Sequence, residues 1–182
     1  NEFINQEERS FTIIAYPVPS IGEQFEEIFE AVRKVNTLDK EKYKIIQQNM
    51  IRILDRAEFV HIMGRGANMT NLTISLMDLD DPDTQTKFEN CLADVNIPVG
   101  EVFTSPKLTG TGGLLHVNEA YLNGLCYKNL RIRFAEGMVT EYSCDNFEDP
   151  EEGKKFIREN LLFNRETLPM GEFAIGTNTT AY

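Results

Sequence analysis

The chain has 182 residues and a formal net charge of −11 at pH 7, with 41% hydrophobic and 26% charged residues. This composition is typical of a globular protein with one core or two small lobes. The acidic excess argues against nucleic acid as a partner, because phosphate binding relies on clustered lysine and arginine. The sequence has no run of about 18 apolar residues that would form a membrane helix, so we also expect no membrane partner.

The cysteines, Cys91, Cys126 and Cys144, are far apart in the sequence and contain no Cys-x-x-Cys pair. An odd number of cysteines at such spacing indicates neither a disulfide framework nor a thiolate zinc site. A reducing cytoplasm is therefore the expected location.

The first part of the chain predicts a strand, two helices and a second strand. Residues Phe11–Tyr16 form a short apolar run closed by prolines, which is typical of a buried strand. Ser20 is expected to cap a helix whose apolar residues recur at helical spacing up to Val35. A second helix is predicted over Asp39–Glu58, followed by a strand at Phe59–Met63. This order is typical of the C-terminal part of an α/β domain without its earlier strands.

Two loops resemble ligand-binding motifs but lack essential residues. The glycine-containing turn Gly64–Asn68 leads into the β-rich run Asn71–Met77, so it predicts a hairpin; a phosphate-binding loop would need a helix and a Lys-Ser/Thr pair. Residues Asp78–Glu89 place carboxylates at three calcium-loop positions, but Asp83 stands where the calcium loop requires glycine. We therefore expect a solvated acidic turn.

From Asn96 onward short strands predominate. The predicted strands are Val99–Thr104, Gly113–Val117, Ala120–Cys126, Leu130–Phe134, Val139–Ser143 and Glu172–Gly176. Glu136-Gly137 is expected to be a two-residue turn, and Asp149–Asn160 a helix with Pro150 in its first turn. The predicted fold class is mixed α+β. Residues 1–80 would be the C-terminal part of an α/β domain, and residues 81–182 the first part of a β-rich catalytic-type domain with a mixed sheet.

Two glutamates, Glu101 and Glu172, each follow a glycine within an otherwise apolar strand. An ionised carboxylate removed from water without a partner costs several kcal/mol, so each needs a cation, a hydrogen-bond network or the surface. The residue pattern alone leaves two alternatives open. The glutamates either share a cation or point to solvent from edge strands.

Both glutamate segments resemble motifs of the thermophilic aminopeptidase family of metallopeptidases, which includes aminopeptidases T and S. Residues 96–106 (Asn-Ile-Pro-Val-Gly-Glu-Val-Phe-Thr-Ser-Pro) resemble that family's P-x-G-E-V-F-T-x-P segment. Residues 168–178 resemble its L-G-E-x-A-I-G-x-N segment. The resemblance is clear from about Val95 to Tyr182 and weaker over Val60–Leu76.

The resemblance implies a metal-dependent aminopeptidase acting on peptides through two divalent ions (Zn, Co, Mn or Mg). Glu101 would bind one metal, and Glu172 would be a catalytic residue that bridges both. The remaining ligands would lie beyond Tyr182. The chain is therefore expected to be an inactive fragment, truncated at both ends. The family also implies a homodimer.

Other polar residues are expected to have structural roles. His61 and His116 lie in apolar strands and match no ligand histidine of the family, and Lys107 is expected at the solvated surface. The stretch Lys107–Gly113 differs from the acidic, asparagine-containing stretch expected there from the better-known members of the family. We therefore expect the details of the substrate pocket to differ from those of these members. Two other functions stay open: a non-catalytic acidic module that binds a peptide or protein at a strand edge, and an assembly role for the α/β part.

Overall fold

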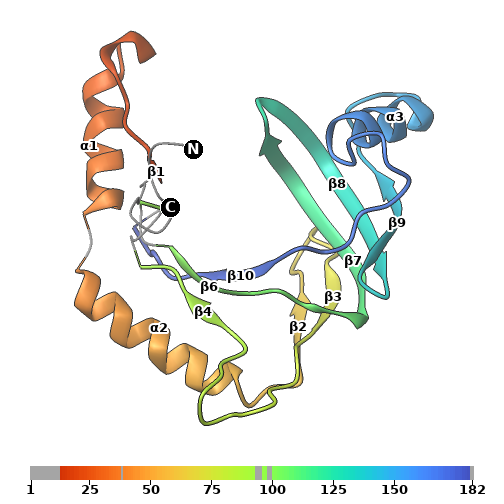
Figure 1. Ribbon diagram of the computed structural model, residues 1–182. Coiled ribbons are helices and arrows are strands. Elements are labelled where there is room, and N and C mark those ends of the chain that lie inside the picture. The colour runs from red at the N-terminus through yellow and green to blue at the C-terminus, as the bar shows by residue number, and fades with distance from the viewer. Residues whose placement is uncertain (1–12, 38, 93–95, 98–99, 181–182) are drawn as a thin grey trace, which may run out of the picture. The chain divides into compact units, whose positions relative to one another are not determined.

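The computed structural model describes residues 13–37, 39–92, 96–97 and 100–180 (Figure 1). The chain divides into two compact units, each made of segments that are distant in sequence. The first contains residues 1–56, 81–104 and 174–182, and the second residues 57–80 and 105–173. The predicted division into residues 1–80 and 81–182 concerns domains of a longer protein and stays a prediction. None of the described helices has the length and apolarity needed to span a membrane.

The helices of the first unit are the short 3-10 helix η2 (Pro19–Ile21), α1 (Phe25–Asn36) and α2 (Lys40–Leu54). The prediction that Ser20 caps α1 is wrong. Pro19 begins the separate 3-10 turn that includes Ser20, and α1 begins after Gly22, whose φ of 125° redirects the chain. Asp39, in contrast, caps α2, because its carboxylate accepts a hydrogen bond from the Lys42 N–H at 3.0 Å.

The strands of the first unit are short. β1 (Ile13–Ile14) pairs in parallel with β5 (Asn96–Ile97), and a three-stranded sheet has the order β10 (Phe173–Gly176), β6 (Glu101–Thr104) and β4 (Glu89–Asn90). β1 is not the buried strand that the sequence predicts. Ile13 and Ile14 are 59% and 48% exposed, because pairing with β5 satisfies the backbone of β1 but does not cover the side chains on its faces. Phe11 and Val99, where predicted strands begin, lie outside the described residues.

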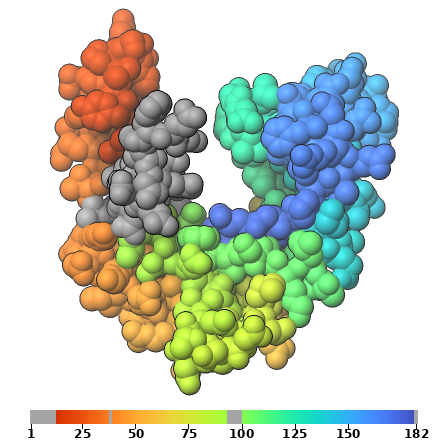
Figure 2. All heavy atoms as spheres, viewed as in Figure 1, coloured from red at the N-terminus to blue at the C-terminus, as the bar shows by residue number. Residues whose placement is uncertain are grey.

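α1 is amphipathic, yet none of its residues is fully buried, and it lies at the surface (Figure 2). α2 contributes Gln47 and Ile51 to the buried interior of the unit. Phe88 and Val102 complete this small core, each with 0% exposure. The core of the first unit is thus built by α2 and the segments around β4 and β6.

In the described part of the second unit, five antiparallel strands form one sheet. Their order is β2 (Phe59–Met63), β3 (Asn71–Ser75), β7 (Lys107–Leu122), β8 (Leu125–Ala135) and β9 (Met138–Ser143). The predicted hairpin of β2 and β3 is confirmed. The mixed α+β class is confirmed as well, since these sheets occur with three α-helices among the described residues.

β7 and β8 form one long hairpin (Figure 1). The predicted strand Gly113–Val117 lies within β7, which extends further at both ends. The predicted strand Ala120–Cys126 is wrong, because β7 ends at Leu122 and the chain reverses at Asn123-Gly124. Both turn residues have positive φ, 52° and 75°, as a two-residue hairpin turn requires. The predicted turn at Glu136-Gly137 is confirmed, with φ of 48° and 68°.

Helix α3 (Pro150–Asn160) packs beside β9. Asp149 caps it by accepting a hydrogen bond from the Glu151 N–H at 2.9 Å, and Pro150 occupies the first turn as predicted. Ile157 on α3 is completely buried, and the ring of Phe156 lies 5.0 Å from that of Tyr127 on β8. α3 thus supplies much of the apolar cover in this unit.

Candidate functional site

Glu101 is the first residue of β6 and is half-buried. Alternate strand residues face opposite sides, and Val102 and Thr104 are the ones that enter the core, at 0% and 5% exposure. The Thr104 hydroxyl donates to the Lys87 carbonyl at 2.6 Å. β6 is thus held by its buried side, and the Glu101 carboxylate belongs to the other side.

Glu172 is exposed and directly precedes β10. The segment before it is held against the β8–β9 turn, because the Val139 N–H donates to the Leu168 carbonyl at 3.0 Å and the Met170 N–H to the Gly137 carbonyl at 2.8 Å. Two residues after the second of these hydrogen bonds, the chain reaches Glu172. The backbone next to this glutamate is therefore fixed although its side chain is in water.

Thr177 joins the two glutamate motifs. Its N–H donates to the Gly100 carbonyl at 2.7 Å, and its hydroxyl donates to the same oxygen at 3.0 Å. β10, which follows Glu172, is the neighbour of β6, which begins with Glu101. Two motifs about 70 residues apart in sequence therefore lie on adjacent strands of one sheet.

Each of the two carboxylates suits a divalent cation, but neither completes a site for one. Within the described ranges, neither Glu101 nor Glu172 has a hydrogen-bond or ion-pair partner for its carboxylate, and carboxylate oxygens are good ligands for such ions. No group of three or more metal-ligating side chains occurs among the described residues. Because stable zinc sites normally use three or four protein ligands, these residues fit part of a metal site. The ligand roles of both glutamates stay predictions.

The two histidines have structural contacts. His116 is 3% exposed, and its Nδ1 accepts a hydrogen bond from the Met69 N–H at 2.9 Å. His61 lies at the surface, with Nε2 2.7 Å from the Asn71 side-chain oxygen. Lys107 forms an exposed ion pair with Asp78 at 3.0 Å. Each contact agrees with the structural role expected from the sequence.

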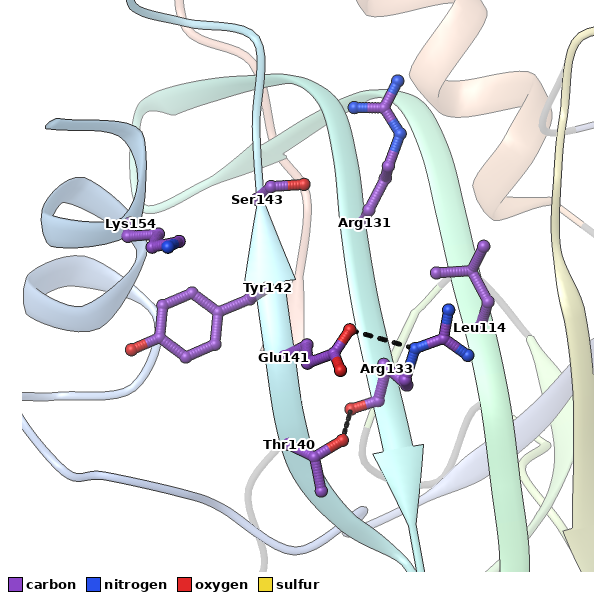
Figure 3. Close-up of a pocket in the computed structure, with 8 residues that line it drawn as sticks. All are labelled: Leu114, Arg131, Arg133, Thr140, Glu141, Tyr142, Ser143 and Lys154. Atoms are coloured by element: carbon purple, nitrogen blue, oxygen red, sulfur yellow. Dashed lines mark hydrogen bonds and ion pairs between the residues drawn. The ribbon is translucent and has the colours of Figure 1, made fainter. Parts of the chain in front are cut away.

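A cavity of about 550 Å³ in the second unit is a feature that sequence reasoning missed (Figure 3). The strict alternation of Leu130–Phe134 could have indicated it, since Leu130, Ile132 and Phe134 are buried and the intervening arginines are not. The cavity is lined by Leu114, Arg131, Arg133, Thr140, Glu141, Tyr142, Ser143 and Lys154.

Every cation of this cavity already has a carboxylate partner. Arg133 pairs with Glu141 at 3.2 Å (Figure 3), Arg131 with Asp145 at 3.0 Å, and Lys154 with Glu151 at 2.7 Å. The hydrogen bond from Arg131 lowers the pKa of Asp145 below its ordinary value. Similarly, the hydrogen bond to Glu151 raises the pKa of Lys154. Each cation that lines the cavity is therefore already engaged by a carboxylate.

Comparison with known proteins agrees with the fold and with the family that the two motifs resemble. The family described as "Thermophilic metalloprotease (M29)" matches residues 3–181, and no curated protein matches the chain. The solved structure of wild-type AmpT from Thermus thermophilus is similar, with a TM-score of 0.63 and 19% identity over 90% of this chain and 42% of that chain. At this identity the likeness shows the fold alone, and the chain spans less than half of the AmpT chain. The family match, which covers nearly every residue, shows that the chain belongs to the M29 thermophilic metalloprotease family.

Proposed function

We propose that the protein containing this chain is a metal-dependent aminopeptidase that releases N-terminal residues from peptides. Membership of a metalloprotease family supports hydrolysis of peptides, and the resemblance of both glutamate motifs to those of aminopeptidases T and S supports the narrower activity. The observation that carries the proposal is the contact between these motifs. Thr177, which follows Glu172, donates two hydrogen bonds to the carbonyl of Gly100, the residue before Glu101.

In this proposal Glu101 binds one divalent ion and Glu172 bridges two. A bridging role suits Glu172 because the two oxygens of one carboxylate can each bind a different metal, and its side chain is exposed and unpartnered within the described ranges. When bound, two such ions would lower the pKa of a water molecule and polarise the scissile carbonyl. Zinc, cobalt, manganese and magnesium are the candidate metals.

The described residues hold too few ligands for this chemistry, so other parts of the complete protein would supply the remaining ligands and the general base. We therefore expect the isolated chain to be inactive. A homodimer is a further part of the proposal, and light scattering of the complete protein would test it.

The decisive experiment measures hydrolysis of leucyl-p-nitroanilide and a panel of dipeptides by the complete protein with Co²⁺ or Zn²⁺. Glu172→Gln and Glu101→Gln remove one charge each with little change in shape. Glu166→Gln and Glu89→Gln are matched controls, since both residues are exposed and lie near the two motifs in sequence. We expect metal-dependent turnover that both motif variants lose and both controls retain. A complete protein that binds no metal and hydrolyses no substrate would contradict the proposal and favour a peptide-binding module.

A further inference from the structure

We propose that Gln47 is a positioning residue for Glu101, acting from helix α2 on the backbone that carries this glutamate. The inference rests on the proposed function, because it gives Gln47 a role only if Glu101 is a metal ligand. No motif of the sequence points to Gln47.

Gln47 lies inside the first unit with 0% exposure. Its side-chain nitrogen donates to the Cys91 carbonyl at 3.3 Å and to the Thr177 hydroxyl at 3.0 Å. These acceptors are 44 and 130 residues away in sequence. One amide group thus connects α2 to the segment that follows β4 and to the segment that follows β10.

Both of its acceptors hold the Gly100–Glu101 backbone. The Cys91 carbonyl accepts from the Gly100 N–H at 3.4 Å, and the Cys91 N–H donates to the Glu101 carbonyl at 2.8 Å. On the other side, the Thr177 hydroxyl donates to the Gly100 carbonyl at 3.0 Å. Gln47 is therefore hydrogen-bonded to Cys91 and Thr177, which hold the Gly100–Glu101 backbone from the β4 side and the β10 side.

The Gln47 amide also orients the Thr177 hydroxyl as a donor to the Gly100 carbonyl. A hydroxyl has a single proton, and because Thr177 accepts from Gln47, that proton is free to point at the Gly100 carbonyl. Without Gln47, the hydroxyl loses the donor that fixes its orientation. The Gly100 carbonyl would then be held by the Thr177 N–H, the partner that remains.

Stability alone is a poor explanation for this buried amide. Its oxygen has no hydrogen-bond partner within the described residues, and an unsatisfied buried acceptor offsets much of what the two donated hydrogen bonds contribute. Gln47→Met leaves the Cys91 carbonyl with the Gly100 N–H and the Gly100 carbonyl with the Thr177 N–H, so neither backbone acceptor becomes unsatisfied and the expected loss of stability is small. Geometry matters more, because metal ligands must be held to within about 0.5 Å of their productive positions.

The test uses Co²⁺ alone as the probe, on the complete protein. Gln47→Met keeps the length of the side chain and removes its amide, and Gln48→Met is the matched control, because Gln48 is the half-buried next residue of α2. Co²⁺ titration followed by visible absorption, thermal unfolding without metal, and kcat and KM are measured for each protein.

We expect Gln47→Met to bind Co²⁺ at least tenfold more weakly, with an altered absorption spectrum. We expect kcat to fall by a larger factor than KM rises, and the Tm without metal to change by no more than about 3 °C. Gln48→Met should match the wild type in every respect. A merely structural role predicts the reverse, a large loss of Tm with an unchanged cobalt spectrum.

Thr177 gives a second, independent test if Gln47→Met fails to fold. Thr177→Ser keeps the hydroxyl and should retain Co²⁺ affinity within about twofold, whereas the isosteric Thr177→Val should lose about tenfold or more. Equal affinities of the serine and valine variants would overturn the inference.

The outcomes separate the two proposals. Wild-type protein that binds Co²⁺ and hydrolyses peptides, beside a Gln47→Met variant with the same affinity and spectrum, would overturn the role of Gln47 and leave the proposed function intact. Wild-type protein that does neither would overturn both.

Discussion

Replacing Gly113 by alanine should destabilise the protein far more than the same change at Gly124. Both glycines have positive φ, 129° at Gly113 and 75° at Gly124. A Cβ on Gly113 would collide with the carbonyl oxygen of Asn71 and lie 2.9 Å from Leu72 Cα, both backbone atoms of the paired strand β3. A Cβ on Gly124, at the tip of the β7–β8 hairpin, would meet nothing within 4 Å.

The expected losses of unfolding free energy follow from the backbone strain at positive φ and from the steric overlap of the added Cβ. A non-glycine residue at positive φ costs about 1–2 kcal/mol in the left-handed region, which is the whole cost at Gly124. At Gly113 the backbone strain is about 1–3 kcal/mol, and overpacking against atoms that cannot move adds about 1–3 kcal/mol. We therefore expect a loss of about 4 kcal/mol at Gly113 and about 1 kcal/mol at Gly124.

The assay is urea denaturation of the complete protein, followed by far-UV circular dichroism, with both variants beside the wild type. Comparing the midpoints at equal slope gives the change in unfolding free energy. Equal losses for the two variants would refute the reasoning, since the collision with β3 is what distinguishes the two sites.

Three further predictions concern stability. Ile157→Ala should cost about 2–5 kcal/mol in the same urea assay, because it empties a fully buried position of α3; a loss below 1 kcal/mol would mean that α3 does not pack as described. Asp39→Ala should cost about 1 kcal/mol by removing the cap of α2, and Asp39→Asn, which retains a side-chain acceptor, should recover most of it. Asp145→Asn should cost at most about 1 kcal/mol at pH 7, because the Arg131–Asp145 pair is partly exposed. The lowered pKa of Asp145 means that this difference is present above the ordinary aspartate pKa of about 3.9 and shrinks as the pH falls below it. Unfolding midpoints at pH 7 and pH 3 test this, and a difference that grows on acidification would contradict it.

Local signals in the sequence predicted many elements well. The strand Phe59–Met63 was predicted with its observed ends, because a β-rich apolar run there is bounded by Glu58 and Gly64. The helix after Asp149 was predicted with Pro150 in its first turn, a signal that acts within a few residues. Such features depend on neighbours along the chain, so a single sequence contains them.

The errors arose where one local signal was overlooked or where the rest of the fold decided. Asn123-Gly124 is a strong hairpin signal, yet the sequence interpretation placed a strand across it. The exposure of β1 could not be predicted, because the strength of an apolar run as a strand does not say what covers it. The sequence predicted shorter strands in place of β7 and β8, because Asn118 and Asn129 interrupt the apolar pattern of these two strands.

The candidate site also contains residues that local sequence signals mark and residues that only the folded chain brings together. Glu101 and Glu172 were proposed as ligands because each is an isolated charge within an apolar segment that resembles a known motif. The hydrogen bonds of Gln47 could not be predicted, because nothing in α2 marks this residue, and its partners Cys91 and Thr177 come near only in the folded chain. Pairing between distant segments is the information that a single sequence lacks.

The central claim is that Glu101 and Glu172 bind metal together, and calorimetric titration of the complete protein with Zn²⁺ tests it most directly. The account predicts that Glu101→Gln and Glu172→Gln each weaken Zn²⁺ binding at least tenfold, while Glu89→Gln and Glu166→Gln leave it unchanged. Equal Zn²⁺ affinity of the wild type and both motif variants would contradict the account, and would leave the two glutamates as solvent-exposed residues of a sheet edge.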